Sequence, residues 1–340
     1  MASRVAVSRV AVVGAGSWGT TVATLVARNC PTILWARRAE LVDEVNTHHT
    51  NRRYLTGYAL PKQIVATASL GEAVSAADVV VMAVPSHGFR EILAEARAHI
   101  APGAPVVSLT KGVEQGSLKR MTELVGELLP DHPAGVLTGP NLALEIMAGY
   151  PAASVVAMTD DTLCDELHRL FRADWFRVYT NTDVIGCEVA GALKNVMAIA
   201  CGMADGMGFG DNTRAALMTR GLAELTRLGV ALGGRPLTFS GLAGMGDLVA
   251  TCTSPHSRNR HVGAQLGLGR SIDEIVTEMK MVAEGVKTTR AVVDLARHVG
   301  VEMPIAEEVA GVLYDGKAAA DVVASLMQRE TGPELSGIAG

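Results

Sequence analysis

A lysine stands in an unusual setting in this chain. Lys194 lies within residues 189–200, whose other members are mostly small or apolar at helical spacing. An ammonium group among apolar neighbours costs free energy unless it has a partner or a task. Burial or a nearby cation also lowers a lysine's pKa towards the range where it exchanges a proton. This setting favours general acid–base chemistry, and the alternative is a lysine on the solvated face of an amphipathic helix.

Other charged residues follow apolar or glycine-rich segments. Lys111 comes just after the apolar run 105–109, and Asp247 ends the glycine-rich segment 241–246. Segment 251–260 contains several hydroxyl groups, an amide and two arginines close together in sequence. Such a set of side chains can form a compact pocket for an anion. A hydrogen bond from a guanidinium to a phosphate contributes about 1.5–3 kcal/mol. The alternatives are a surface lysine in a loop and a solvated basic turn.

A complete G-x-G-x-x-G pattern occurs near the N-terminus. Gly14 permits a tight turn, Gly16 lets a pyrophosphate approach the backbone, and Gly19 lets the helix pack on the strand. The helix N-terminus then offers unpaired N–H groups to an anion. The pattern alone is weak, but here the flanking elements occur in the required order. Strand, pattern, helix and second strand fall at residues 9–13, 14–19, 20–28 and 32–35.

The end of the second predicted strand selects the dinucleotide. Sites for NAD usually have Asp or Glu there, which binds the ribose 2′-hydroxyl. This chain has Ala36, Arg37 and Arg38 instead. Two guanidinium groups suit a 2′-phosphate, so NADPH is favoured over NADH or at least accepted. The alternative is that one of the two arginines faces solvent.

The alternation of strands and helices gives the fold class. Residues 78–84 form the clearest buried strand, and we expect further strands at 105–109, 135–137, 152–158 and 176–179. Asn141 is expected to cap a helix that begins at residue 142. After Asp183 the pattern is helical. We therefore predict an α/β chain with a Rossmann-like doubly wound sheet domain, followed by an all-α C-terminal domain. The predicted segments are an NAD(P)-binding domain (1–185), a helical substrate-binding and catalytic domain (186–332) and a frayed tail (333–340).

Composition excludes several classes of function. The 340 residues carry a net charge of −5, which argues against nucleic-acid binding over a wide surface. The five cysteines form no C-x-x-C pair, so we expect reduced thiols, as in the cytoplasm, without disulfides or a zinc site. The histidines show no ligand spacing, so no metal is predicted. We found no apolar run near the length of about 20 residues that spans a membrane.

Several motifs together resemble one family. GAGSWGT, GALKNV, GFGDNTRAALMTRG, GLAGMGDL, TCTSPHSRNR and VAEGVKT occur in this order, from Gly14 to about Thr289. They resemble the bacterial-type NAD(P)-dependent glycerol-3-phosphate dehydrogenases. The pair GALKNV and TCTSPHSRNR is far more specific than the glycine pattern. The resemblance implies reversible hydride transfer between NAD(P)H and dihydroxyacetone phosphate, which gives sn-glycerol 3-phosphate for phospholipid synthesis.

The resemblance also assigns roles by position. It implies that Lys194 is the proton donor to the ketone oxygen. We also expect a homodimer in the cytoplasm. Asn141 stands where the family typically has serine, so that substrate contact is altered. The implied substrate contacts are Lys111, Gly139, Asn141, Lys194, Asp247, Ser257, Arg258 and Asn259. The cofactor residues are Gly14, Gly16, Ser17, Trp18, Gly19, Arg37, Arg38, Tyr54, Lys111, Ala143, Arg258, Val282 and Glu284.

Two other functions fit parts of the pattern. A related two-domain dehydrogenase of a keto or hydroxy acid would need an arginine for a carboxylate, but not the pocket around Arg258. A non-catalytic protein that senses NAD(P)H would need the glycine pattern without Lys111, Lys194 and Asp247. The joint presence of these residues favours the dehydrogenase of a phosphorylated substrate.

Overall fold

The computed structural model describes residues 7–279, 283–330 and 332–334. The described chain forms two compact units. Unit 1 contains the residues up to 110 together with 121–184, and unit 2 contains 111–120 and the residues from 185 onward. The α/β and all-α parts of the predicted fold correspond to these two units.

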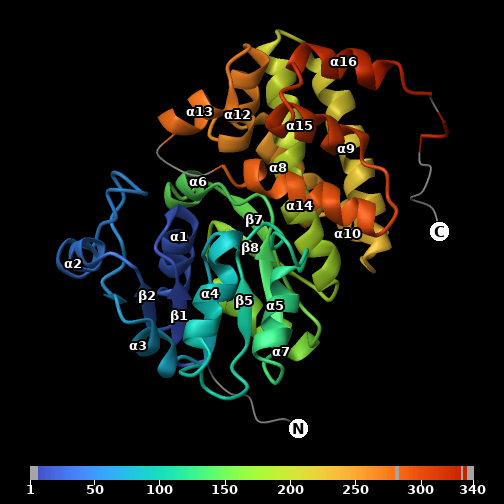
Figure 1. Cartoon of the computed structure of the whole chain (residues 1–340). Coiled ribbons are helices and arrows are strands. Elements are labelled where there is room, and N and C mark those ends of the chain that lie inside the picture. The colour runs from blue at the N-terminus through green and yellow to red at the C-terminus, as the bar shows by residue number, and fades with distance from the viewer. Residues whose placement is uncertain (1–6, 280–282, 331, 335–340) are drawn as a thin grey trace. The chain divides into compact units, whose positions relative to one another are not determined.

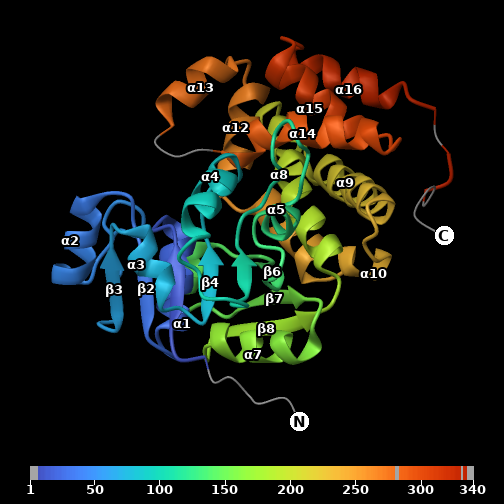
Figure 2. The same cartoon turned by 60° about the horizontal axis from the view of Figure 1, so that its bottom comes forward.

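Unit 1 is built on one eight-stranded sheet in its described part, with the order β3-β2-β1-β4-β5-β6-β7-β8 (Figures 1 and 2). Strands β1 to β6 are parallel, β7 runs antiparallel to β6, and β8 is parallel to β7. The strand order reverses between β1 and β4, which is where such sheets bind ligands at their carboxyl edge. The strands are β1 Val10–Val13, β2 Thr32–Trp35, β3 Ile64–Thr67, β4 Val79–Met82, β5 Val106–Ser108, β6 Ala134–Thr138, β7 Ala152–Met158 and β8 Phe176–Asn181.

Both faces of this sheet are buried under helices. Val10 and Val12 of β1 pack in the apolar cluster that contains α1 and α7. Ala11 and Val13 point the other way, into the cluster with α3, α4 and α5. This alternation makes the sheet doubly wound and confirms the predicted fold class. The helices of unit 1 are α1 Ser17–Val26, α2 Ala39–His48, α3 Leu70–Ser75, α4 Ser86–Ala96, α5 Met121–Leu128, α6 Ala143–Met147 and α7 Asp161–Phe171.

Two local predictions for unit 1 were wrong. Strand β3 was missed, because it has only four residues and lies at the edge of the sheet, where Val65 is largely exposed. Asn141 does not cap the next helix. The N-cap of α6 is Leu142, and the Asn141 amide instead donates to Ser154 Oγ at 3.1 Å.

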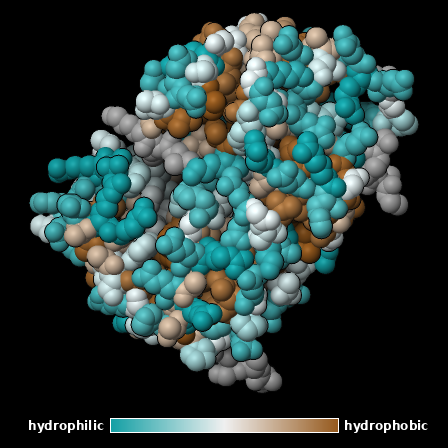
Figure 3. Space-filling model, viewed as in Figure 1, coloured by the Kyte–Doolittle hydropathy of each residue, from teal (hydrophilic) through white to brown (hydrophobic). Residues whose placement is uncertain are grey.

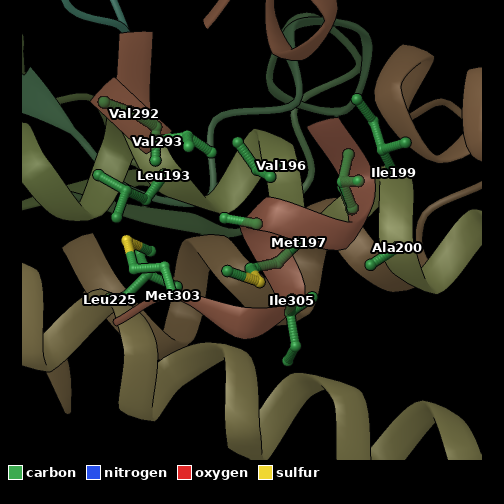
Figure 4. Close-up of a cluster of buried hydrophobic side chains, with 14 of the residues drawn as sticks. Leu193, Val196, Met197, Ile199, Ala200, Leu225, Val292, Val293, Met303 and Ile305 are labelled. Atoms are coloured by element: carbon green, nitrogen blue, oxygen red, sulfur yellow. The ribbon is translucent and has the colours of Figure 1, made fainter. Parts of the chain in front are cut away.

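The regular elements among the described residues of unit 2 are helices, and segment 111–120 adds turns and an isolated bridge between Val113 and Arg120. Its central element is α8, and Figure 4 shows side chains from α8, α9, α14 and α15 packed together. Leu193, Val196 and Met197 of α8 are almost completely buried in this core. The helices are α8 Val184–Gly206, α9 Asp211–Ala231, α10 Pro236–Phe239, the π-helical turn η1 Leu242–Gly246, α11 Asp247–Thr253, α12 Arg258–Gly267, α13 Ile272–Glu278, α14 Glu284–His298, α15 Pro304–Tyr314 and α16 Ala319–Met327.

Helix α8 is long and apolar enough, by length and composition, to cross a membrane, so the expectation that no apolar run approaches this length was wrong. However, 94% of its most apolar window is buried inside the protein. Such burial is typical of a core helix, so the hydropathy of α8 is only weak evidence for a membrane segment. The face drawn in Figure 3 is largely hydrophilic, with hydrophobic patches separated by polar side chains.

Helices α8 and α12 approach each other through glycines. A Cβ at Gly202 would lie 2.1 Å from the Arg260 carbonyl oxygen, and one at Gly263 would lie 2.0 Å from that of Ile199. Gly206 and Gly267 make equivalent close contacts one turn further along each helix. Glycines four residues apart share one helix face, so both helices present a flat strip of backbone to each other. This contact sets the position of α12 relative to α8.

Segment 111–120 packs in unit 2, although it lies inside the predicted domain 1–185. Val113 is buried in the helical core, and the Gln115 side chain donates to the Lys287 carbonyl oxygen at 2.9 Å. The continuous boundary near residue 185 therefore misplaces this segment. The sequence could not reveal this, because the contacts that hold the segment lie far along the chain.

Candidate functional site

Two lysines of unit 2 contact the same carboxylate, that of Asp247. Lys111 Nζ lies 2.5 Å from Asp247 Oδ2, and Lys194 Nζ lies 2.7 Å from Asp247 Oδ1. The Asp247 carboxylate is almost completely buried and the Lys194 side chain is 8% exposed. Two ammonium groups on one buried carboxylate leave an excess positive charge in a region of low dielectric. Such an arrangement is poised to stabilise a negative charge that develops on a bound molecule.

The local structure explains why Asp247 lies there. The glycine-rich segment before it forms η1, and a Cβ at Gly244 would lie 2.1 Å from the Phe239 carbonyl oxygen. Only glycine lets η1 pack this closely on α10. Asp247 then begins α11, so its carboxylate is held at the start of a helix that packs into the core.

Thr251 belongs to this cluster and was not predicted as a site residue. Lys194 Nζ donates to Thr251 Oγ1 at 2.5 Å, and that hydroxyl donates to the Asp247 carbonyl oxygen at 2.6 Å. Asp247 and Thr251 are four residues apart on α11, so they share one helix face. That spacing was a signal in the sequence that could have identified Thr251.

Burial lowers the pKa of Lys111 to about 8. The Asp247 carboxylate opposes this shift, and the second ammonium group, that of Lys194, adds to it. The Lys111 side chain therefore changes charge close to neutral pH, unlike an ordinary surface lysine.

The two arginines of the 251–260 segment differ in their surroundings. Arg260 pairs with Asp205 at 2.7 Å, and Asp205 also pairs with Arg214, so Arg260 joins α12 to α8 and α9. Burial lowers the pKa of Arg258, and the Glu284 carboxylate opposes that shift. Ser257 caps α12, since its Oγ accepts from the backbone N–H of Arg260 at 3.3 Å. Arg260 therefore has an ion-pair partner on α8, which the prediction of an anion pocket with two arginines did not include.

Asn259 connects three helices of unit 2. Its Nδ2 donates to Asn195 Oδ1, and its Oδ1 accepts from the backbone N–H of Gly285, both at 2.9 Å. Asn195 directly follows Lys194 on α8, so this bridge fixes the helix that carries the lysine. Asn195 was not predicted, and its position beside Lys194 was the only signal available in the sequence.

The glycine pattern of unit 1 forms the turn between β1 and α1. Gly14 has a φ of 121°, and a Cβ there would lie 2.5 Å from the Ala83 carbonyl oxygen after β4. A Cβ at Gly19 would lie 2.0 Å from the Gly14 carbonyl oxygen. By contrast, nothing lies within 4 Å of a Cβ built on Gly16. The structure therefore requires Gly14 and Gly19 for packing, while Gly16 borders open space.

Other predicted cofactor residues gather around this turn. Ser17 Oγ donates to the Tyr54 carbonyl oxygen at 3.3 Å, and Trp18 Nε1 is a buried donor with no partner among the described residues. Arg37 and Arg38 are exposed just beyond the end of β2. A buried N–H without a partner is costly, so the one on Trp18 indicates a place where a bound molecule or water accepts a hydrogen bond.

The turn after β6 holds the remaining predicted residues of unit 1. Gly139 has a φ of 136°, and a side chain there would be strained. Asn141 Oδ1 is a buried acceptor without a partner in the described structure. Ala143 begins α6, which packs beside α1.

The predicted site residues thus fall into two groups. Unit 2 brings Lys111, Lys194 and Asp247 into contact and holds Ser257, Arg258, Asn259 and Glu284 around α12 and α14. Unit 1 holds the glycine turn and the residues around it. Val282 lies outside the described residues.

Comparison with known proteins identifies both parts of the chain. Residues 9–164 match the model for the NAD-dependent glycerol-3-phosphate dehydrogenase N-terminus, and residues 183–324 match the model for the C-terminus. Glycerol-3-phosphate dehydrogenase (NAD(P)+) 2 of Sphingopyxis alaskensis is 60% identical over 326 residues, which cover 96% of this chain and 98% of the relative. The NAD(P)+ glycerol-3-phosphate dehydrogenase of Mycobacterium avium is 52% identical over 338 residues, 99% of each chain.

A solved structure agrees with these matches. The crystal structure of glycerol-3-phosphate dehydrogenase from Coxiella burnetii has a TM-score of 0.91 and 36% sequence identity. The match covers 95% of this chain and 99% of that chain. Because both halves match their family models and the identity extends over the full length, the chain belongs to the NAD-dependent glycerol-3-phosphate dehydrogenase family.

Proposed function

We propose that this protein catalyses reversible hydride transfer between NAD(P)H and dihydroxyacetone phosphate, giving sn-glycerol 3-phosphate. The observation that carries the proposal is the buried contact of Lys111 and Lys194 with Asp247. Ketone reduction requires a proton donor at the carbonyl oxygen and a positive field for the developing alkoxide. The Lys194 ammonium group can meet both requirements. It shares the single negative charge of Asp247 with Lys111, so positive charge remains for the developing alkoxide.

Lys194 is the proton donor in this proposal. Its ammonium group has three N–H bonds, and contacts with Asp247 Oδ1 and Thr251 Oγ1 use two of them. The third N–H is then available to the ketone oxygen, to which it passes its proton during reduction. In the reverse direction the neutral amine removes the proton from the hydroxyl. Lys111 contributes a second positive charge beside the same carboxylate.

The substrate phosphate is assigned to the N-terminal region of α12. The Arg258 side chain is exposed at the first position of α12, where its guanidinium can donate ionic hydrogen bonds to a phosphate. Ser257 and Asn259 flank it and are fixed by their hydrogen bonds to Arg260, Asn195 and Gly285. Fixing the phosphate places the carbonyl carbon and oxygen without further loss of entropy in the transition state.

The residues around the glycine turn fit a dinucleotide. Gly16 borders open space, no side chain caps the start of α1 among the described residues, and Trp18 Nε1 lacks an acceptor. These groups would hold the pyrophosphate and its neighbouring atoms. Bound NAD(P)H supplies the hydride, while this chain's own residues bind, orient and protonate.

A spectrophotometric assay tests the proposed reaction. Purified protein is mixed with NADPH or NADH and dihydroxyacetone phosphate, and loss of reduced nicotinamide absorbance is recorded. We expect turnover with this substrate and little with 2-keto or 3-hydroxy acids of similar size. Turnover of a keto acid alone would favour the related dehydrogenase. Nucleotide binding without turnover of any substrate would favour the sensor.

The cofactor preference is a separate part of the proposal. The exposed pair Arg37 and Arg38 supports NADPH over NADH. Replacing both by alanine is expected to lower kcat/KM for NADPH by about 10- to 100-fold, because charge-assisted hydrogen bonds contribute about 1.5–3 kcal/mol. The value for NADH should change by less than about twofold, since NADH lacks the 2′-phosphate. Equal losses for both nucleotides would contradict this assignment.

The depressed pKa of Lys111 predicts a pH effect. Its ammonium form prevails below about pH 8 and is lost as pH rises through that value. We expect kcat/KM for dihydroxyacetone phosphate to fall above pH 8, by up to about tenfold per unit, as a positive charge leaves the site. Lys111→Arg keeps its charge throughout this range, so its profile should stay flat where the wild type declines. A decline of equal steepness in both proteins would assign the titration to another group.

Three further properties belong to the same proposal. The predicted segments 1–185 and 186–332 act as the cofactor-binding and substrate-binding parts, with 111–120 contributed to the second. We also propose a homodimer in the cytoplasm, whose product serves phospholipid synthesis. Light scattering coupled to size-exclusion chromatography tests the dimer, and a monomer at working concentration would contradict it.

A further inference from the structure

Asn51 is a completely buried polar residue in the connection between α2 and β3. Its Nδ2 donates to the carbonyl oxygen of Ala15 at 3.0 Å and to Thr20 Oγ1 at 2.9 Å. Ala15 is the central residue of the glycine turn, and Thr20 lies in α1. A segment more than thirty residues away along the chain therefore holds the turn that the dinucleotide is proposed to contact.

The chemistry of the partners fixes the orientation of this amide. The Ala15 carbonyl oxygen can only accept a hydrogen bond, so the amide nitrogen rather than the oxygen must face it. Both N–H groups of Asn51 are then used on the turn and the helix. Its Oδ1 is buried without a partner in the described structure, so the side chain is held by its donor side alone.

The residues after Asn51 are fastened to α1 as well. The backbone N–H groups of Tyr54 and Leu55 donate to the Asn51 carbonyl oxygen at 3.2 and 2.8 Å, which closes a compact turn. Ser17 Oγ donates to the Tyr54 carbonyl oxygen at 3.3 Å. Residues 51–55 are thus tied to the glycine turn and to the start of α1 at separate points, which restrains the turn from one side.

The planarity of the peptide gives this restraint a direction. In a trans peptide the C=O of one residue and the N–H of the next point in opposite directions. No cis peptide occurs among the described residues. Because Asn51 holds the Ala15 C=O towards itself, the N–H of Gly16 must point away from Asn51. A Cβ built on Gly16 would have nothing within 4 Å, so there is space for a ligand beside this residue.

We propose that Asn51 is a positioning residue for dinucleotide binding. It fixes the Ala15–Gly16 peptide so that the Gly16 N–H is already aimed at the pyrophosphate before the nucleotide binds. Preorganisation of this kind raises affinity, because the bound ligand does not have to order the loop. The inference rests on the proposed NAD(P) binding, but not on the identity of the second substrate.

The test compares Asn51→Ala with a matched variant, Asn46→Ala. Asn46 also makes two hydrogen bonds to backbone, donating to the Ala66 carbonyl oxygen at 2.9 Å and accepting from the Ala66 N–H at 2.8 Å, in the same unit. Kd values for NADPH and NADH are measured by fluorescence without any second substrate, and Tm is measured for each protein. Both variants should lower Tm, but only Asn51→Ala should change the Kd values.

We expect Asn51→Ala to weaken NADPH and NADH by the same factor, about tenfold, because both nucleotides share the pyrophosphate. Unchanged Kd values in Asn51→Ala, or equal weakening in Asn46→Ala, would overturn the proposal.

Thr20→Val is the second variant, for the case that Asn51→Ala does not fold. It keeps the shape of the Thr20 side chain but removes the oxygen that accepts from Asn51, and it should raise the Kd of both nucleotides by about twofold. Unchanged affinity in Thr20→Val would then overturn it. A wild type that binds both nucleotides but does not reduce dihydroxyacetone phosphate contradicts the proposed function and leaves this inference intact.

Discussion

Replacing Lys194 by methionine is expected to lower kcat for reduction of dihydroxyacetone phosphate by about 10²- to 10⁴-fold, the usual contribution of a positioned general acid. Methionine keeps the length and apolar character of the stem, so it suits the buried position on α8. Asp247 keeps Lys111 as an ion-pair partner, and no buried carboxylate is left alone. The loss should therefore appear mainly in the chemical step, measured as kcat at saturating NADPH.

Two further measurements show whether this loss is specific. The Kd for NADPH of Lys194→Met should stay within about twofold of wild type, because no cofactor contact is assigned to this side chain. Lys62→Met is a matched control, since Lys62 is an exposed lysine of unit 1 that has no part in the proposed site. Wild-type turnover by Lys194→Met would remove Lys194 as the proton donor and direct attention to Lys111.

Gly263→Ala is expected to lower the free energy of unfolding by about 2–3 kcal/mol. A glycine-to-alanine substitution inside a helix usually has the opposite effect. Alanine normally favours a helix interior by about 0.5–1 kcal/mol over glycine. At Gly263, however, the new Cβ would lie 2.0 Å from the Ile199 carbonyl oxygen and 2.9 Å from Gly202 Cα. Backbone atoms cannot rotate away as a side chain can, so α12 must move away from α8.

Gly126→Ala is the matched control for this prediction. Gly126 lies in α5, and nothing lies within 4 Å of a Cβ built there. This substitution should stabilise the protein by about 0.5–1 kcal/mol through helix propensity alone. Urea denaturation followed by circular dichroism compares the two variants. If both changed stability in the same direction, the close approach of α8 and α12 would not hold in solution.

The movement of α12 should also affect binding. Ser257, Arg258 and Asn259 lie at the N-terminal end of α12, whereas the glycine turn belongs to unit 1. Gly263→Ala is therefore expected to raise KM for dihydroxyacetone phosphate more than KM for NADPH. Steady-state kinetics with each substrate varied in turn measures the difference.

The parts of the fold that the sequence predicted correctly depend on local interactions. The glycine turn could be identified because Gly14 needs a positive φ and Gly19 needs close packing within a few residues of the chain. The buried strands β1, β4 and β7 could be identified because strands covered on both faces are continuous apolar runs. Strand β3 escaped because a short edge strand with an exposed face carries neither signal.

The site was predictable only in part, and for the same reason. Lys194 was marked by its apolar surroundings, and Asp247 by the glycines that precede it. Their contact joins two helices, and the contact between Lys111 and Asp247 spans 136 residues of sequence. Residue types and spacing cannot show such contacts, because they depend on how helices pack. For this reason Arg260 was first grouped with Arg258, although it pairs with Asp205.

The sequence by itself determined the family, the doubly wound sheet, the helical second part and the residue types that can do the chemistry. These properties rest on local conformational preferences and on motifs that are contiguous in the chain. Only the tertiary structure decided that Lys111 and Lys194 share one carboxylate, that segment 111–120 joins unit 2, and that Asn51 holds the glycine turn. Each of these depends on contacts between distant segments, which form only when the apolar faces of helices and strands bury one another.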